Sequence, residues 1–441
     1  MNIIKICLLF LFPLALSAQG ENQFSLNAAI DYAIKNNYDH KNQIVDNLII
    51  YERIKDVITT GLPNINASLS YRNNFYLPTS ILPGEIIGQP GTTVPVQFGT
   101  PNNLDFNIDV QQLIFDGRYI VGLQARKMMK QVSEQGVKMS EENVRDLIKK
   151  SYFAVLMTKE SAETLKKNKS VLEKLLNDTK QIYKEGLIEE LDVDRLQLSL
   201  ANLNKEILKL ENQLALTTSA LKFNMGYSID KDIVLTDSIT SYFGTYYQSA
   251  PSNNFDIKNR VEYKLQQDNI LLKGYDVKQQ KAGYMPSLVA FFNTGTQAQR
   301  QRFDFFDTKG QYFYYGSFGF KLMIPIWDGN SRLYKLNQTK LGIEKSKNDF
   351  EKFQVGAKVQ AFQAQVSFYN AKRDYDNQLE VLALAEKINK KAKIMFKEGI
   401  GSSFELANSE GELIKTQINV LQSMYAIIIA KLDYDKAVGN K

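Results

Sequence analysis

The chain has 441 residues, of which 44% are hydrophobic and 23% charged, and its formal net charge is +6. It is apolar enough to fold, and because the small basic excess is interspersed with acids, its charge does not favour nucleic acid as a partner. One histidine (His40) and one cysteine (Cys7) are too few for a zinc, haem or iron–sulfur site, so no metal or cofactor is expected.

The N-terminal residues have the pattern of an export signal. A short basic start ends at Lys5, an apolar run extends from Ile6 to Leu16, and small residues follow up to Ala18. That run is too short to span a membrane, and the order is that of a secretory signal peptide. We predict a signal peptide over 1–18. No later run approaches eighteen apolar residues, so a mature chain that enters a membrane must do so as strands of a closed barrel.

The rest of the chain is an internal duplication. Segments of the first copy return in the same order in the second, and their spacing changes only once. The matching pairs are Asn36–Lys41 with Asn259–Lys264, Pro63 with Pro286, Asp116-Gly117 with Asp328-Gly329, Gly186-Leu187 with Gly399-Ile400, and Gly226 with Gly439. The spacing changes because of residues 77–103, which carry five of the ten prolines and predict a long irregular loop.

The sequence of each copy predicts a helix, followed by a pair of strands and then by a long helical hairpin. In chain order we expect N-terminal helices at 19–62, a strand pair at 63–115, a hairpin at 116–226 with its tip near 186, a middle segment at 227–258, a helix at 259–285, a strand pair at 286–327, and a hairpin at 328–441 with its tip near 399. The fold class is thus mainly α with a β part.

The predicted strands of the first copy alternate between apolar and polar residues, and the second copy shows a noisier form of the same pattern, with Phe318, Phe320 and Leu322 against Ser317, Gly319 and Lys321. Ile65, Ala67 and Leu69 share one face of the first strand, and Asn66 and Ser68 share the other. A half-buried sheet in a soluble domain would alternate in the same way. Aromatic residues favour a membrane sheet instead, because they gather where the two ends of such a sheet would meet the membrane interfaces. They are Tyr71, Phe75 and Tyr76 toward one end and Phe115 and Trp327 toward the other.

The hairpins are too long for a compact core. Residues 118–184 and 330–397 contain no proline, and a helix of that length measures roughly 100 Å. A generic coiled coil would explain the helices but not the strand pairs before them. Four strands per chain cannot close a barrel, so a membrane-spanning barrel would have to be shared, and three copies would give twelve strands.

With these features in order, the sequence resembles the TolC family of outer-membrane efflux and secretion channels over the whole mature chain. The residues that carry the resemblance are Phe24–Ala29, Asn36-Asn37, Pro63, Pro286, the two Asp-Gly turns, Gly186-Leu187 with Asp192-Val193, and Gly399-Ile400 with Glu405-Leu406. The resemblance implies a homotrimer in the cell outer membrane, with a twelve-stranded β-barrel continuous with a periplasmic α-helical tunnel. The helices at 19–62 and 259–285 would be periplasmic, and the segment at 227–258 would belong to a belt around the tunnel.

The implied function is that of a passive exit channel in a tripartite efflux or type I secretion system. Its partners would be a periplasmic adaptor (membrane fusion) protein and an inner-membrane pump of the resistance-nodulation-division or ABC type. The family's gate acids fall on Asp192 and Glu405, with Asn408 at a third gate position. Gly401 and Phe396 stand where the family's best-known member has an arginine and a tyrosine.

The hairpin tips are the expected adaptor-docking surface. Gly186 and Gly399 let the chain reverse, and Leu187 and Ile400 would be exposed unless a partner covers them. Packing on a neighbouring helix is the alternative for these two apolar residues. For Glu405, the alternative is a first-turn acid favoured by the helix dipole.

Two other classes of function compete. A periplasmic coiled-coil structural protein or adaptor would also have long helices, but it would lack the paired amphipathic strands or the tandem repeat. An enzyme is the least supported, because the sequence has no glycine-rich phosphate loop, no Ser/His/Asp set and no nucleophilic cysteine.

Overall fold

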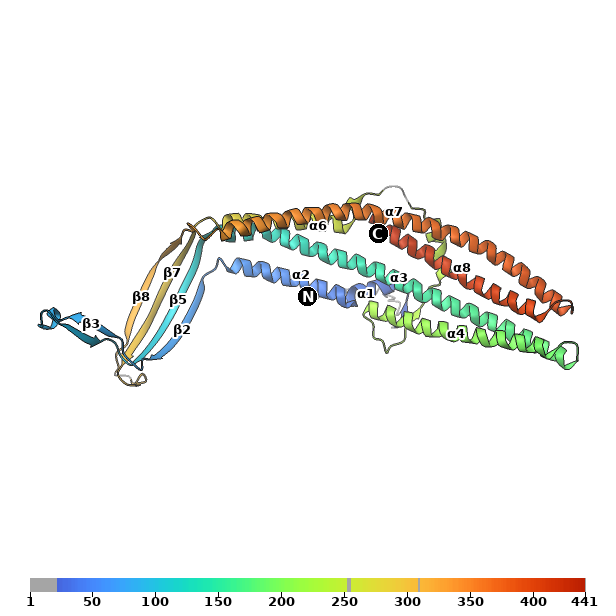
Figure 1. Ribbon diagram of the computed structural model, residues 1–441, viewed down its shortest axis with the longest axis horizontal. Coiled ribbons are helices and arrows are strands. Elements are labelled where there is room, and N and C mark those ends of the chain that lie inside the picture. Colours follow the sequence, from blue (N-terminus) through green and yellow to red (C-terminus); the bar gives the residue numbers. More distant parts are fainter. Residues whose placement is uncertain (1–21, 252–254, 308–309, 441) are drawn as a thin grey trace, which may run out of the picture. The chain divides into compact units, whose positions relative to one another are not determined.

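The computed structural model describes residues 22–251, 255–307 and 310–440 (Figure 1). The predicted signal peptide at 1–18 lies outside the described residues. The chain forms two compact units, and each draws on both copies of the duplication. We call Asn47–Glu134 with Gln266–Phe350 the sheet unit, and the remaining described residues the helical unit.

The sheet unit contains a four-stranded antiparallel sheet in the order β2-β5-β7-β8. Its strands are β2 (Asn64–Asn73), β5 (Asn102–Asp116), β7 (Ser287–Arg300) and β8 (Phe313–Met323). The two copies therefore meet at the β5–β7 ladder. Strands β2 and β8 are the edges, and neither has a second strand partner within the described chain.

The prediction of a purely irregular loop at 77–103 is wrong. This segment contains β3 (Thr79–Pro83) and β4 (Thr93–Gln97), which pair antiparallel around a short 3₁₀ helix, η1 (Gly84–Ile87). Proline is tolerated here because a two-stranded hairpin leaves one side of each strand unpaired, so the missing N–H of Pro95 need not break the ladder. The proline count indicated an insertion but not its local pairing.

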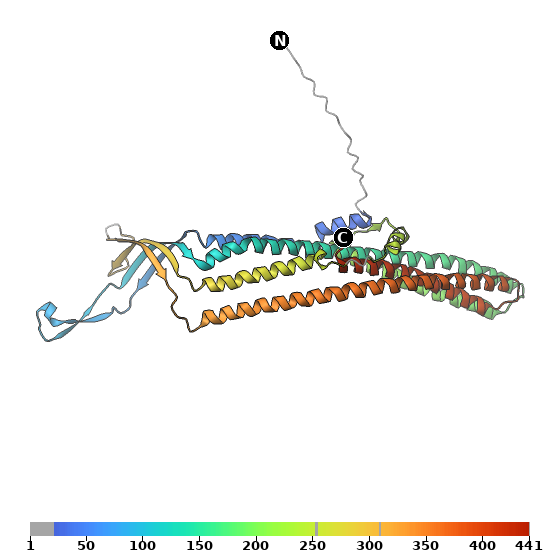
Figure 2. The same ribbon diagram turned by 90° about the horizontal axis from the view of Figure 1, so that it is seen from above.

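The remaining helices form two groups. Two helices precede the strand pairs, α2 (Tyr38–Thr59) and α6 (Val261–Ala282). Two long hairpins follow them, α3 (Gly117–Lys184) with α4 (Glu190–Met225) and α7 (Ser331–Lys397) with α8 (Ser403–Val438), which Figure 2 shows from a second side. Among the described helices, only α8 is long and apolar enough, by length and composition, to cross a membrane. However, its Ile427 and Ile428 are fully buried within the helical unit.

The ends of the returning helices show that the duplication is structural. Gly226 ends α4 and Gly439 ends α8, and both have left-handed backbone, with φ of 69° and 76°. A Cβ on Gly226 would lie 2.3 Å from the carbonyl oxygen of Asn36, and one on Gly439 would lie 2.8 Å from the backbone of Asn259. The same close approach thus recurs at the matching positions of the two copies.

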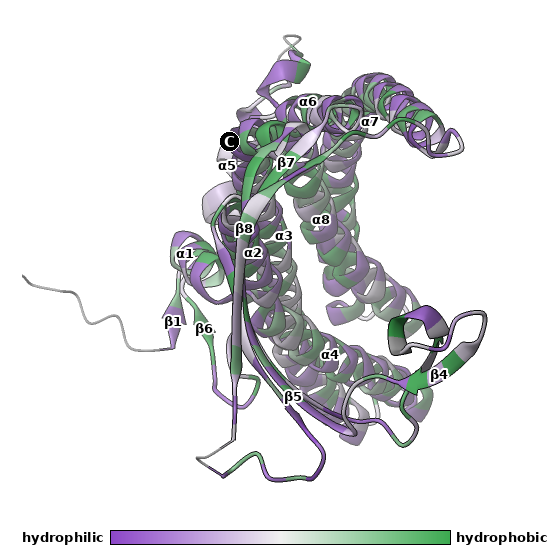
Figure 3. Ribbon diagram, turned by 90° about the vertical axis from the view of Figure 1, so that its left-hand side faces the viewer, coloured by the Kyte–Doolittle hydropathy of each residue, from purple (hydrophilic) through white to green (hydrophobic). Residues whose placement is uncertain are grey.

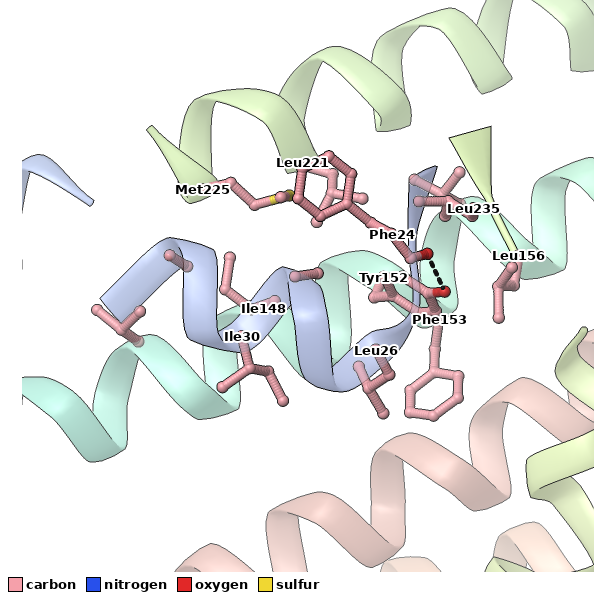
Figure 4. Close-up of a cluster of buried hydrophobic side chains, with 14 of the residues drawn as sticks. Phe24, Leu26, Ile30, Ile148, Tyr152, Phe153, Leu156, Leu221, Met225 and Leu235 are labelled. Carbon is pink, nitrogen blue, oxygen red and sulfur yellow. Dashed lines mark hydrogen bonds between the residues drawn. The ribbon is translucent and has the colours of Figure 1, made fainter. Parts of the chain in front are cut away.

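The main core of the helical unit lies where the N-terminal segment meets α3 and α4 (Figure 4). Strand β1 (Gln23–Phe24) pairs in parallel with β6 (Val234–Leu235) and leads into α1 (Leu26–Asn36). Tyr152 and Phe153 of α3 are fully buried beneath this segment. Burial of aromatic rings of this size is a large apolar contribution to stability, so this cluster fixes the N-terminal segment to α3.

The segment predicted to form a middle belt, 227–258, contributes Tyr227, Leu235 and Ile239 to this core and is also held by the carboxylate of Asp237. It contains β6, α5 (Ile239–Gln248) and η2 (Ile257–Asn259). Asp237 accepts hydrogen bonds from the Leu26 N–H and from the hydroxyls of Tyr152 and Tyr242, each at 2.9 Å. Burial acts to raise the pKa of this carboxyl, but these hydrogen bonds together lower it. Burial and the bond to Asp237 raise the pKa of Tyr242 to about 12.

Candidate functional site: hairpin tips and a two-faced sheet

The tip of the first hairpin is a glycine-dependent helix end. Gly186 has φ of 76°, which side chains other than glycine rarely adopt. Its N–H donates to the carbonyl of Tyr183, and the Leu187 N–H donates to that of Ile182. This is the Schellman pattern, which satisfies carbonyls at the helix end while the chain turns away.

The tip of the second hairpin repeats that pattern. Gly399 has φ of 73°, its N–H donates to the carbonyl of Phe396, and the Ile400 N–H donates to that of Met395. The side chains that follow the two glycines are strongly exposed, at 71% for Leu187 and 74% for Ile400. In the described chain these residues therefore do not pack on a neighbouring helix.

Glu405 and Asn408, two of the predicted gate residues, are exposed on the first turns of α8. Ser402 caps this helix by accepting a hydrogen bond from the Glu405 N–H at 3.1 Å. This is the serine half of a capping box, and the exposed carboxylate of Glu405 lies in the first helical turn, where the helix dipole favours an acid.

The third predicted gate residue, Asp192, has a partner that the sequence did not indicate. Its carboxylate accepts a hydrogen bond from the Ser403 hydroxyl, which also receives a bond from Arg195 Nη1 at 3.3 Å. The Arg195 guanidinium lies over the ring of Phe404, 5.5 Å from its centroid. Asp192 therefore ties α4 to the start of α8. The duplication could not show this contact, because it gives matching positions within each copy rather than contacts between copies.

A second polar contact joins α7 to α8 further from the tip. Lys393 Nζ lies 2.6 Å from a carboxylate oxygen of Glu410, whose side chain is almost fully buried. Buried Asn389 donates to the Ser409 hydroxyl at 3.3 Å. In the first hairpin, α3 and α4 instead bury an apolar cluster, so the two hairpins have different interiors. That cluster is Leu165, Leu172, Leu176, Val193, Leu196, Leu203 and Ile207.

The strand register shows which residues lie on the apolar face of the sheet. Ala67 lies opposite Ile108, and Leu69 lies opposite Phe106. The neighbouring row runs from Val110 to Phe292 of β7 and Phe318 of β8, whereas Ile108 and Phe106 lie opposite Thr294 and Thr296 of β7. Directly opposed residues share a face, so this face is apolar on β2 and β5 and carries both phenylalanine and threonine on β7. Figure 3 colours each residue of these strands by its hydropathy.

The other face of the sheet is polar in its central part. Asp105 lies opposite Ser70 and Gln297, and Asp109 lies opposite Asn66 and Asn293. Among the described residues neither aspartate forms an ion pair. Their partners are neutral donors instead: the Tyr315 hydroxyl at 3.1 Å from Asp105, and the Asn107 and Asn293 amides for Asp109. This face is suited to contact with water.

The two predicted strand-to-helix turns share an aspartate cap but differ in backbone. Asp116 Oδ1 accepts from the N–H groups of Arg118 and Tyr119, and Gly117 is already the first residue of α3. Asp328 caps α7 by accepting from the Arg332 N–H at 3.1 Å. There, Gly329 and Asn330 are both left-handed, each with φ of 67°. The matching Asp-Gly pairs therefore share a capping aspartate but do not form an identical turn.

The described residues contain no group of three or more His, Cys, Asp and Glu placed to hold a metal ion.

Solved structures of bacterial channels share this fold. The chain aligns with CusC at a TM-score of 0.73 and 14% identity, over 94% of this chain and 92% of that one. It aligns with the outer membrane protein VceC of Vibrio cholerae at 0.69 and 15%, over 94% and 96%. With the CmeC outer membrane channel of Campylobacter jejuni the values are 0.70 and 16%, over 94% and 85%. No protein-family model and no curated protein matches the sequence.

The fold is therefore that of the outer-membrane channel proteins, mainly α with a small antiparallel sheet. The predicted fold class is confirmed, and so is the resemblance to the TolC family at the level of the fold.

Proposed function

We propose that this protein is an outer-membrane channel that works as a homotrimer and passively conducts exported molecules, without enzymatic activity. The observation that carries the proposal is the sheet: four strands in register, one apolar face, one polar face, and two edges without strand partners. Each unpaired backbone group would cost several kcal/mol in lipid, so a membrane sheet of this kind must close.

Copies of this chain can close the sheet with consistent strand directions. All three ladders are antiparallel and the number of strands is even, so β8 of one copy can pair antiparallel with β2 of the next. Three copies give a twelve-stranded barrel, within the range known for outer-membrane proteins. The apolar face would contact lipid, and Asp105 and Asp109 would line a hydrated lumen.

An exposed apolar stripe on α7 supports the same assembly. Its members follow one another at alternating spacings of four and three residues, as in a helix–helix seam. They are Val355, Val359, Phe362, Val366 and Tyr369, and all five are exposed. The opposite stripe of α7, which includes Ala357, Ala361 and Phe368, is already buried within the chain. A second copy would cover the free stripe and extend the helices into a tunnel wall.

Within this proposal the hairpin tips form the periplasmic entrance. Leu187 and Ile400 would dock a periplasmic adaptor (membrane fusion) protein, which in turn would join an inner-membrane pump of the resistance-nodulation-division or ABC type. Glu405 and Asn408 would face the pore, and Asp192 would control it through the contact with Ser403. Three copies of Glu405 around one axis would repel one another and favour cations.

The test is the location and oligomeric size of the native protein. Membrane fractionation should place it in the outer membrane, and mild detergent should release an oligomer of three chains that heat converts to the monomer. Recovery of a folded monomer from the soluble periplasm would contradict the proposal and favour a periplasmic structural or adaptor protein.

A further inference from the structure

A cluster of aromatic rings lies at the outer end of the sheet, the end opposite the strand-to-helix turns. Phe303 and Phe305, from the connection between β7 and β8, stack edge-on against Tyr71, with ring centroids 5.3 and 5.8 Å away. Phe306 contacts Phe303 at 6.2 Å. We call Tyr71, Phe303, Phe305 and Phe306 the outer-end cluster.

The outer-end cluster lies beside an edge strand, although its phenylalanines come from elsewhere in the sheet. The connection leaves β7 and leads to β8, yet its rings reach Tyr71 of β2. Asn102 of β5 links the two parts: its amide donates to the Gln301 carbonyl at 3.3 Å, and its oxygen accepts from the Tyr71 hydroxyl at 2.7 Å. Residues 301–305 therefore fold back across β5 to the β2 edge.

Only part of the cluster is used within the chain. Phe305 is 5% exposed and anchors the connection, whereas Phe303 is 61% exposed and Phe306 is 90% exposed. Leaving two such rings in water forfeits apolar burial that a partner could supply, and aromatic residues are favoured anchors at protein interfaces. The cluster therefore has an anchored base and a free apolar surface beside β2.

The strand that must pair with β2 carries a matching residue. In a closed barrel this strand is β8 of the neighbouring copy, and Tyr314 lies near its outer end with 85% of its surface exposed. Within one copy, Tyr314 of β8 lies opposite Thr296 of β7. Tyr71 of β2 lies opposite Leu104 of β5, which in turn lies opposite Ala298 of β7. Thr296 and Ala298 are two positions apart on β7, so within one copy's sheet Tyr314 and Tyr71 share a face and differ in level by two residues, about 7 Å, near the same outer end.

We propose that the outer-end cluster is a docking surface for a second copy of this chain, with Phe303 and Phe306 packing on Tyr314 of the neighbouring β8. The contact would clamp the seam between subunits at the outer end of the barrel. This inference rests on the proposed trimer. The other occupant that the chemistry allows is a lipid headgroup layer, in which aromatic residues also gather.

Disulfide cross-linking tests the proposal, because the chain's one cysteine, Cys7, lies in the predicted signal peptide. Phe303→Cys and Tyr314→Cys chains with different tags are co-expressed, oxidised and run without reducing agent. A disulfide requires Cα atoms within about 7 Å, so a covalent species with both tags places the two positions at one seam. Ile81→Cys, similarly exposed but carried by β3 and not in contact with Tyr71, replaces Phe303→Cys as the control and should give no such species.

A second measurement covers the case in which a cysteine variant does not assemble. Phe303→Ala with Phe306→Ala should lower the temperature at which the detergent-solubilised trimer dissociates, whereas Ile81→Ala with Ile86→Ala should leave it unchanged. Normal trimers with no cross-link and an unchanged dissociation temperature would overturn the clamp and favour lipid contact. A wild-type protein that forms no trimer would instead contradict the proposed function.

Discussion

Arginine substitutions at adjacent positions of β2 test which face of the sheet contacts lipid. All 10 residues of β2 pair with β5. A strand of this length measures about 34 Å, and at the usual tilt of barrel strands it would span about 25 Å of membrane thickness. Ala67 lies in the middle third of that ladder on the apolar face. An arginine facing lipid near mid-membrane costs about 2–4 kcal/mol, so Ala67→Arg should cost about 6–12 kcal/mol per trimer. Ser68→Arg adds the same side chain to the polar face, where water solvates the charge.

The assay is the yield of heat-sensitive trimer in the outer membrane. Ala67→Arg should strongly reduce this yield, and Ser68→Arg should leave most of it. Because the two positions are adjacent in one strand, they lie at nearly the same depth and in the same ladder, which makes Ser68→Arg a matched control. Equal loss in both variants would refute the assignment of faces.

Further expectations concern the tips and the belt. The double variant Leu187→Asp with Ile400→Asp should abolish export without lowering the yield of trimer. Normal export by this variant would show that the tips are not the docking surface. Glu405→Ala should raise single-channel conductance and weaken cation preference in planar bilayers; unchanged values would exclude it from the gate. Gly399→Ala should destabilise the second tip by about 1 kcal/mol, seen as faster proteolysis there, because its backbone is left-handed. The pKa of Asp237 is depressed below its ordinary value of 3.8, so its contribution holds above about pH 4 and is lost as pH falls. Asp237→Asn should lower the melting temperature at pH 7 and reduce the further loss between pH 5 and 3; equal acid loss in both proteins would contradict this assignment.

Local signals in the sequence were enough to predict much of the architecture. Strict alternation in the first strand predicted the two faces that the register shows, because a period of two is intrinsic to a β-strand. Glycine at the tips predicted the chain reversals, because few other residues adopt the left-handed backbone found at Gly186 and Gly399. The prolines of residues 77–103 obscured the β3–β4 pairing, because a hairpin tolerates them on its unpaired sides.

Contacts between different segments of the chain could not be predicted. The Asp192–Ser403 hydrogen bond joins α4 to α8, and the Asp237 carboxylate collects donors from Leu26, Tyr152 and Tyr242. Except for Tyr242, which is five residues from Asp237, these partners are far apart in sequence and share no local pattern, so only the folded chain brings them together. The roles proposed for Asp192, Glu405, Leu187 and Ile400 remain predictions.

Conductance measurements on the purified, heat-sensitive oligomer test the central claim most directly. If three chains close a shared barrel around the polar face of the sheet, the oligomer should insert into planar bilayers and give uniform single-channel steps with cation preference. Heating it to monomers before addition should abolish the steps. An oligomer of three chains that inserts but gives no conductance, even with Glu405→Ala, would contradict the channel account.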